Sequence, residues 1–146
     1  MAEADTGARG PQVGMRHRLE WRVGSDRTVP HLLPESEEFA GLPSVLATGY
    51  LVGVVEWACI RVLDGVLVPG QNTVGTHVDI SHEAATPPGE VVVVDAELTA
   101  VEGRILDFDV IARDGAAVIS RGTHRRAIID RERFDARLAR RIAEQD

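Results

Sequence analysis

Residues 43–63, PSVLATGYLVGVVEWACIRVL, form the longest apolar run in the chain. Apolar side chains recur along it at helical spacing and also cover much of the remaining circumference. They are Leu51, Val55, Cys59 and Val62 on one stripe, with Val52, Val54, Ala58 and Ile60 around it. The run predicts a long helix that is buried nearly all round. Its one carboxylate, Glu56, then needs a partner, a proton or a chemical role, because a buried unpaired carboxylate loses its hydration.

Length and composition indicate one domain. The chain has 146 residues and is 44% hydrophobic, which suits a single compact core. Residues 1–13 are small, polar and interrupted by Gly and Pro, so we expect a disordered leader there and a single domain over residues 14–146. No basic start or apolar h-region marks a secretory signal, and polar residues interrupt the apolar run. We therefore expect a cytoplasmic protein without a membrane span.

The charge distribution bears on the partners. A net charge of −7 argues against nucleic acid, because binding phosphate needs a positive surface. Arginines nevertheless gather near the C-terminus, most of them interpreted as a solvated helix face. They are Arg121, Arg125, Arg126, Arg131, Arg133, Arg137, Arg140 and Arg141. Arg125 and Arg126 precede the expected helix and could instead contact a nucleotide phosphate.

Residue types that the chain lacks exclude several chemistries. There is no lysine, so neither Schiff-base chemistry nor a lysine base is available. Cys59 is the only cysteine, which leaves no internal disulfide and no thiolate cluster. The histidines show neither HxH nor HExxH spacing, and GxSxG, P-loop and GxGxxG motifs are absent. We expect no metal and no resident cofactor.

Alternation of apolar and polar residues predicts the strands. A first strand starts at His17, and four more are expected at 74–81, 90–101, 104–113 and 116–128. Glu102-Gly103 and Asp114-Gly115 join the last three as hairpins. Asp130 is a good N-cap for a final helix. We expect the stripe on that helix to dock on the body; it consists of Phe134, Leu138 and Ile142.

The connection over residues 30–43, PHLLPESEEFAGLP, is the longest irregular segment. Pro34 and Pro43 predict that no regular structure runs across it. Several apolar side chains interrupt its polar residues, as is common in lids that close over a site. They are Leu32, Leu33, Phe39 and Leu42.

The expected order is a strand, a lid-like loop, a buried helix and four strands, which gives an α+β fold. A helix that is apolar nearly all round needs a sheet curved around it. This is the layout of a hotdog fold, with a short C-terminal helix added. A single such sheet leaves strand edges and one helix flank exposed, and pairing two sheets removes both. We expect a homodimer, and a larger assembly stays open.

Three polar residues stand out against this apolar background: Thr48, Glu56 and His82. Each has a simpler interpretation as well. Glu56 could be a structural ion-pair partner of Arg61 or of a strand arginine. His82 could be an ordinary surface histidine at a strand end. Thr48 could be the N-cap of the helix.

Helix geometry constrains how these residues meet. Eight residues of helix separate Thr48 from Glu56 by about 12 Å along the axis, too far for a hydrogen bond. Either Thr48 lies off the helix, in a turn that Gly49 permits, or the site combines residues from two subunits. Both alternatives place the site at a dimer interface. Gly75 could bring backbone N–H groups close to a ligand, or could equally mark a bulge or tight packing.

Four strings of residues carry a family resemblance: HLLPESEEFAGLPSVLATGYLVGVVEWACIRVL at 31–63, VGTHVDISHEAATPPG at 74–89, VEGR at 101–104 and GTHRRAII at 122–129. With them the chain closely resembles the fluoroacetyl-CoA thioesterase family of hotdog proteins, from about Arg27 to Phe134. The resemblance implies an acyl-CoA thioesterase that acts on a small acyl-CoA.

The resemblance also implies roles for particular residues. Its catalytic set falls on Thr48 of ATG, Glu56 of EWAC and His82 of SHEAATPPG. Gly75 corresponds to a glycine near the acyl group, and Arg126 to an arginine on the CoA side. The apolar lid positions fall on Val29, Leu32, Phe39 and Leu42.

Two positions depart from the fluoroacetyl-specific pattern. Leu42 and Tyr50 stand where that enzyme has phenylalanine. Leucine is smaller and more flexible than phenylalanine, so the lid could favour another acyl group, because an apolar pocket separates close analogues by only about 1 to 3 kcal/mol. The acyl group, and whether CoA or a carrier protein bears it, stay open.

In the expected mechanism Glu56 either attacks the thioester carbonyl or activates a water molecule. The sequence does not distinguish these two routes. His82 acts as a general acid or base, or takes a proton from the α-carbon. Thr48 orients the carboxylate or holds the carbonyl oxygen, while Arg126, with Arg125, holds CoA phosphates. The alternatives are a hotdog hydratase or dehydratase, and an acyl-CoA-binding protein without turnover.

Overall fold

The computed structural model describes residues 10–145. Its elements are β1 (Arg16–Arg22), η1 (Ser25–Arg27), α1 (Val29–Leu32), α2 (Glu37–Ala40), α3 (Thr48–Val62), β2 (Gln71–Ile80), β3 (Val91–Glu102), β4 (Ile105–Arg113), β5 (Val118–Asp130) and α4 (Arg131–Ala143). Of the leader expected over residues 1–13, residues 1–9 lie outside the described part of the chain.

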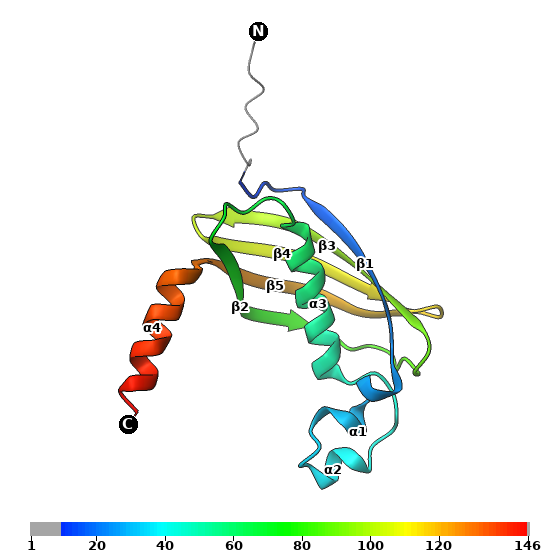
Figure 1. Ribbon diagram of the computed structural model, residues 1–146. Coiled ribbons are helices and arrows are strands. Elements are labelled where there is room, and N and C mark those ends of the chain that lie inside the picture. Colours follow the sequence, from blue (N-terminus) through cyan, green and yellow to red (C-terminus); the bar gives the residue numbers. More distant parts are fainter. Residues whose placement is uncertain (1–9, 146) are drawn as a thin grey trace.

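The five strands form one antiparallel sheet in the order β1-β3-β4-β5-β2, and α3 lies against one face of it (Figure 1). Alternate residues of each central strand point toward α3, as the sequence pattern requires. On β3 these are Val92, Val94, Ala96 and Leu98, all buried. The predicted α+β hotdog layout is confirmed.

Hairpin turns set the register of the sheet. Gly103 has a φ of +60°, a backbone conformation that glycine adopts without strain, and joins β3 to β4. At the next turn one oxygen of Asp114 accepts hydrogen bonds from the backbone N–H groups of Ala116 and Ala117. Both turns lie where the sequence predicted them.

The central helix is shorter and less buried than predicted. It starts at Thr48 rather than near Pro43, and Trp57 and Ile60 are 42% and 44% exposed. The prediction of burial all round is wrong for the single chain, because the sheet covers only one side of α3. Ile60 lies beside residues 72–74 of β2, an edge strand that pairs with β5 alone. An apolar helix flank and an unpaired strand edge are therefore both left without cover.

The connection at 30–43 contains two short helices that the sequence did not predict. Pro30 lies in the first turn of α1, where a missing N–H costs no hydrogen bond. The Ser36 hydroxyl accepts a hydrogen bond from the Phe39 N–H and so caps α2. Leu32 packs against Gly49 at the start of α3. The segment thus lies over the N-terminal end of the central helix (Figure 1).

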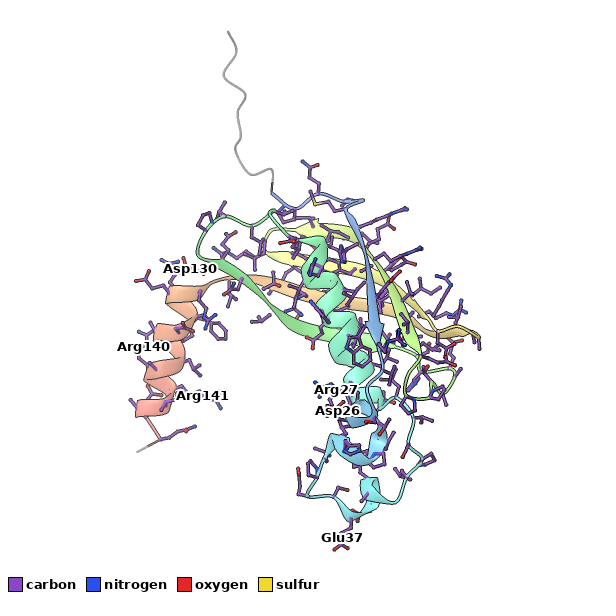
Figure 2. The ribbon with its side chains drawn as sticks, turned by 45° about the vertical axis from the view of Figure 1, so that its right-hand side comes forward. Asp26, Arg27, Glu37, Asp130, Arg140 and Arg141 are labelled. Atoms are coloured by element: carbon purple, nitrogen blue, oxygen red, sulfur yellow. The ribbon has the colours of Figure 1, made fainter. Side chains whose placement is uncertain are left out.

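The C-terminal helix does not dock as predicted. Asp130 is its N-cap, since its carboxylate accepts a hydrogen bond from the Arg133 N–H. The stripe of Phe134, Leu138 and Ile142 is nevertheless exposed, and α4 projects away from the sheet (Figure 2). The physical reason is that α4 follows β5 without a loop, so the helix cannot fold back across its own sheet. A hollow of about 590 Å³ separates Phe134 and Leu138 from Ile60 and Leu67.

Within residues 10–145, no helix combines the length and the apolar character that crossing a bilayer requires.

Candidate active site

Thr48 and His82 come together at the N-terminal end of α3. The Thr48 Oγ1 atom lies 2.7 Å from His82 Nδ1, although the two residues are 34 positions apart. The N-cap of α3 is Ala47, and no side chain caps the helix, so the interpretation of Thr48 as N-cap is wrong. The backbone hydrogen bond from the Leu46 N–H to the Thr86 carbonyl holds the segment after β2 against the start of the helix. The pair is thus fixed by two chain segments.

His82 is more buried than a surface histidine would be. Its Nε2 atom is shielded from solvent and has no hydrogen-bond partner among residues 10–145. Burial lowers the pKa of the imidazole below its ordinary value, because a charged ring is poorly solvated there. His82 is therefore neutral near pH 7, the state in which it can accept a proton.

Glu56 has a strand arginine as its partner. Its Oε1 atom accepts a hydrogen bond of 3.1 Å from Arg126 Nη1, while Arg61 lies near Asp64. The other oxygen has no protein partner within the described chain, and the side chain is 38% exposed. The ion pair with Arg126 thus holds one oxygen of the carboxylate and leaves the other without a protein partner among the described residues.

Arg126 has partners on every side. Its Nε and Nη2 atoms donate to the hydroxyl and the carbonyl of Thr73, at 2.8 and 3.0 Å. Its Nη1 atom contacts both Glu56 and His124, and the side chain is only 6% exposed. The guanidinium is therefore buried beside the carboxylate, and it is not placed to receive phosphates.

Arg125 lies on the other face of the sheet, where it pairs with Asp107 at 2.7 Å. Neighbouring residues of a strand point to opposite faces, so Arg125 and Arg126 cannot share one ligand in one chain. The expectation that both arginines hold CoA phosphates does not fit the single chain.

Gly75 lies directly beneath the Glu56 carboxylate. A Cβ atom at this position would lie 2.5 Å from Glu56 Oε1 and 3.3 Å from His124 Cε1. The register of β2 against β5 also shifts between Gly75 and His77. The bulge and the tight packing that the sequence allowed are both present, and the close neighbour is the carboxylate itself.

His124 is a member of this cluster that the sequence analysis missed. It is 2% exposed, and its ring joins the His77 carbonyl to Arg126. The signal was available in the alternation along β5, because His124, Arg126 and Ile128 all occupy inward positions. Two polar residues in succession on the core face of a strand indicate a buried polar network.

The expected lid residues gather around the start of α3. Val29, Leu32 and Phe39 are partly buried, while Leu42 is exposed. The Arg27 guanidinium lies 5.3 Å from the centre of the Tyr50 ring, a cation–π contact that helps to hold the segment down. These side chains are close to the Thr48 end of the helix rather than to Glu56.

Within one chain the three expected catalytic residues form two separate groups. Thr48 is part of the straight helix, so the alternative that it lies off the helix is wrong. Among the described residues, no hydrogen bond or ion pair joins Glu56 to Thr48 or His82. The remaining alternative is a site built from two subunits.

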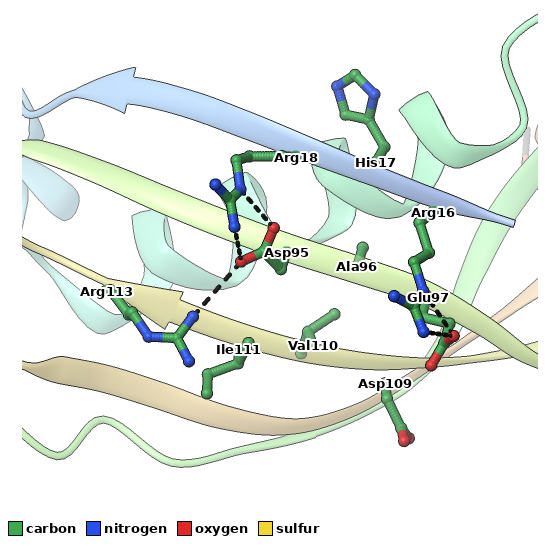
Figure 3. Close-up of a pocket in the computed structure, with 10 residues that line it drawn as sticks. All are labelled: Arg16, His17, Arg18, Asp95, Ala96, Glu97, Asp109, Val110, Ile111 and Arg113. Atoms are coloured by element: carbon green, nitrogen blue, oxygen red, sulfur yellow. Dashed lines mark hydrogen bonds and ion pairs between the residues drawn. The ribbon is translucent and has the colours of Figure 1, made fainter. Parts of the chain in front are cut away.

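Another hollow lies on the opposite side of the sheet from these residues. It measures about 610 Å³ and opens on the face of the sheet away from α3, along β1, β3 and β4 (Figure 3). Its charged groups neutralise one another: Arg18 and Arg113 both contact Asp95, and Arg16 pairs with Glu97. The exceptions are His17 and Asp109, which line the hollow without a hydrogen bond or ion pair among the described residues; no contact joins them to Thr48, Glu56 or His82.

Comparison with known proteins identifies the family of this chain. A family model described as fluoroacetyl-CoA-specific thioesterase matches residues 24–132. The chain belongs to this family. A fluoroacetyl-CoA thioesterase from Streptantibioticus cattleyicolor is 49% identical over 129 residues, which cover 88% of this chain and 93% of that protein. The family resemblance of the sequence motifs is confirmed.

Solved structures agree with this family and with its fold. A fluoroacetyl-CoA thioesterase structure has a TM-score of 0.87 and 48% identity, covering 90% of this chain and 97% of that chain. A thioesterase superfamily member from Thermus thermophilus has a TM-score of 0.80 and 27% identity, covering 92% of this chain and 94% of that chain. The fold of this thioesterase family is thus also found in a more distant relative.

Proposed function

We propose that this protein is a thioesterase that hydrolyses a small acyl-CoA to the free acid and CoA. The observation that carries the proposal is the Thr48 to His82 contact of 2.7 Å at the helix start, in a chain of the fluoroacetyl-CoA-specific thioesterase family. A neutral imidazole held by a hydroxyl is a competent proton acceptor. Glu56, held by Arg126, supplies the carboxylate.

The site is completed by a second copy of the chain. The exposed side of α3 and the unpaired edge of β2 would both be covered by a homodimer. Val52 lies halfway between Thr48 and Glu56, and a two-fold axis beside it would set two α3 helices antiparallel. Thr48 of one chain would then face Glu56 of the partner subunit. Gly53, which has open space beside it, allows the helices to approach closely.

The chemistry of the combined site follows from its groups. Glu56 acts either as a base that activates water for attack on the carbonyl carbon, or as a nucleophile that displaces the CoA thiolate to form an anhydride, which water then hydrolyses. The C–S bond breaks, the acid is released and the CoA sulfur takes a proton. His82 relays protons, and Thr48 fixes the ring and the substrate. Because a thioester carbonyl is already electrophilic, these groups are sufficient for hydrolysis.

A free-thiol assay with acetyl-CoA, fluoroacetyl-CoA and a bulkier branched acyl-CoA tests the proposal. We expect catalytic thiol release from at least one of the small esters. Crotonyl-CoA serves as the control for hydration, which removes the enoyl absorbance without releasing thiol. Loss of that absorbance alone would instead support a hydratase, and tight binding without any thiol release would support a binding protein.

A further inference from the structure

A third hollow, lined by positively charged residues, lies beneath α4. It measures about 350 Å³ and lies between the end of β5, the β3–β4 turn and the first turns of α4. Three arginines line it together with one carboxylate and apolar groups. Its lining consists of Arg104, Ile128, Ile129, Asp130, Arg133, Phe134 and Arg137.

The three arginines of this hollow are not neutralised. Among the described residues, Arg104, Arg133 and Arg137 form no ion pair with a carboxylate; Arg104 donates only to the Ile128 carbonyl, at 3.4 Å. Asp130 is engaged in capping α4. This contrasts with the larger hollow of Figure 3, where the cations are paired with carboxylates. On a protein of net charge −7, three arginines around one hollow, without a carboxylate partner in the described chain, form a local group suited to binding an anion.

The hollow is near the reaction site. Ile128, in its wall, follows Arg126 by two residues on the same face of β5, a distance of roughly 7 Å at about 3.3 Å per residue. Its partner in the sheet is Thr73, which also holds the Arg126 guanidinium. The hollow therefore lies close to the Glu56–Arg126 pair, one step further along β5.

We propose that Arg104, Arg133 and Arg137 bind the phosphorylated adenosine end of the CoA substrate. The inference rests on the proposed thioesterase function and adds the part of the substrate that the reaction does not change. Arginines bind phosphates with charge-assisted, often bidentate, hydrogen bonds. Phe134 lines the same hollow with a partly exposed ring, a surface on which an adenine base can stack.

The test compares two substrates that share the acyl group and the thioester. One is acyl-CoA, and the other is the acyl-pantetheine that lacks the nucleotide. In the Arg133→Ala/Arg137→Ala double variant we expect the KM for acyl-CoA to rise about tenfold with kcat unchanged, because exposed phosphate contacts contribute binding alone. The KM for acyl-pantetheine should not change. Added salt should raise the wild-type KM for acyl-CoA more than that of the variant.

Arg16→Ala is the matched control, since it removes one positive charge from the other, self-neutralised hollow. Any of three results for the double variant would overturn the proposal. They are an equal rise in KM for both substrates, an unchanged KM for acyl-CoA, and a change in oligomeric state. If the wild-type protein hydrolyses either substrate, the proposed thioesterase function still stands in all three cases. Only the absence of thiol release from both would refute that function.

A separate observation concerns His124. Its Nδ1 atom lies 2.8 Å from the His77 carbonyl oxygen, which can only accept, so Nδ1 carries the proton. Nε2 then has a lone pair and accepts from Arg126 Nη1 at 3.1 Å. The charged and titratable groups facing the ring are Arg126, Glu56 and His77, from β5, α3 and β2. Burial lowers the pKa of His124, which agrees with a neutral ring beside a guanidinium.

We infer that His124 is a positioning residue for the reaction. The same Nη1 atom contacts His124 Nε2 and Glu56 Oε1, so the ring fixes the guanidinium that fixes the carboxylate. His124 does not reach the substrate itself. Its effect is therefore expected on kcat rather than on KM.

The His124→Leu variant removes the acceptor and should lower kcat about 10- to 100-fold, as small misplacements of a reacting group do. The His124→Gln variant keeps an oxygen acceptor and should recover most of that loss. Nitrogen-15 NMR of the His124 imidazole in the wild-type protein measures which ring nitrogen carries the proton. This measurement does not depend on the folding of any variant. It should show a protonated Nδ1 and an unprotonated Nε2 at neutral pH.

Two results would refute the role of His124. One is a ring protonated on both nitrogens at neutral pH. The other is a kcat for His124→Leu equal to that of the wild type. If the leucine protein does not fold, the NMR result alone decides.

Discussion

Replacing Glu56 with glutamine should lower kcat for acyl-CoA hydrolysis by about 10³-fold, because an amide can neither attack the carbonyl nor take a proton from water. Glutamine has nearly the same shape, and its oxygen can still accept the hydrogen bond from Arg126. KM and thermal stability should therefore change little. Asp107→Asn is the matched control, since it removes another arginine-paired carboxylate, on the opposite face of the sheet.

Mixing variants tests whether the site is shared. Glu56→Gln and His82→Ala proteins should each be nearly inactive. If Glu56 of one subunit works with His82 of the other, random mixed dimers contain one intact site, and the mixture should recover about a quarter of wild-type activity. Wild-type activity in Glu56→Gln, or no recovery in mixtures that have exchanged subunits, would contradict the proposed site.

Adding one methyl group at Gly75 should lower kcat about 10²-fold, because displacing a reacting group by about 1 Å has an effect of that size. The new Cβ would lie 2.5 Å from Glu56 Oε1, and the carboxylate would have to move. The carboxylate ends a flexible side chain, so this movement costs little stability. Gly75→Ala should thus separate activity from folding.

The measurement pairs kcat with a thermal unfolding midpoint. Gly115→Ala is the control, since a Cβ there meets no atom within 4 Å. We expect both proteins to unfold close to the wild-type temperature, with only Gly75→Ala losing activity. A Gly75→Ala protein with wild-type kcat would show that the position of Oε1 does not matter for turnover. A large drop in its unfolding temperature would show that Gly75 serves packing alone.

The sequence identifies the residues of the candidate site, but it does not show which of them are in contact. Thr48, Glu56 and His82 could be singled out because each is a polar residue in an apolar context or a motif. Their contacts could not be predicted, since the Thr48 to His82 contact spans 34 positions and the Glu56 to Arg126 contact spans 70. Such contacts depend on sheet register, and the bulge beside Gly75 shifts that register.

The sequence by itself determined the fold class, the five strands and the long helices, but not the short helices α1 and α2. The alternation of apolar and polar residues predicted which face of β3, β4 and β5 packs in the core. The apolar run predicted α3, and the turns that contain glycine predicted the hairpins. Periodicity reports only which side of an element is apolar, and not what covers that side.

The tertiary structure alone decided what each face meets. It left one side of α3 and the stripe of α4 exposed, and it buried Arg126 and His124 together beneath Glu56. The physical reason is that these arrangements depend on where α3 crosses the sheet and where β5 ends. Both are set by packing between residues far apart in the chain, which no local pattern encodes.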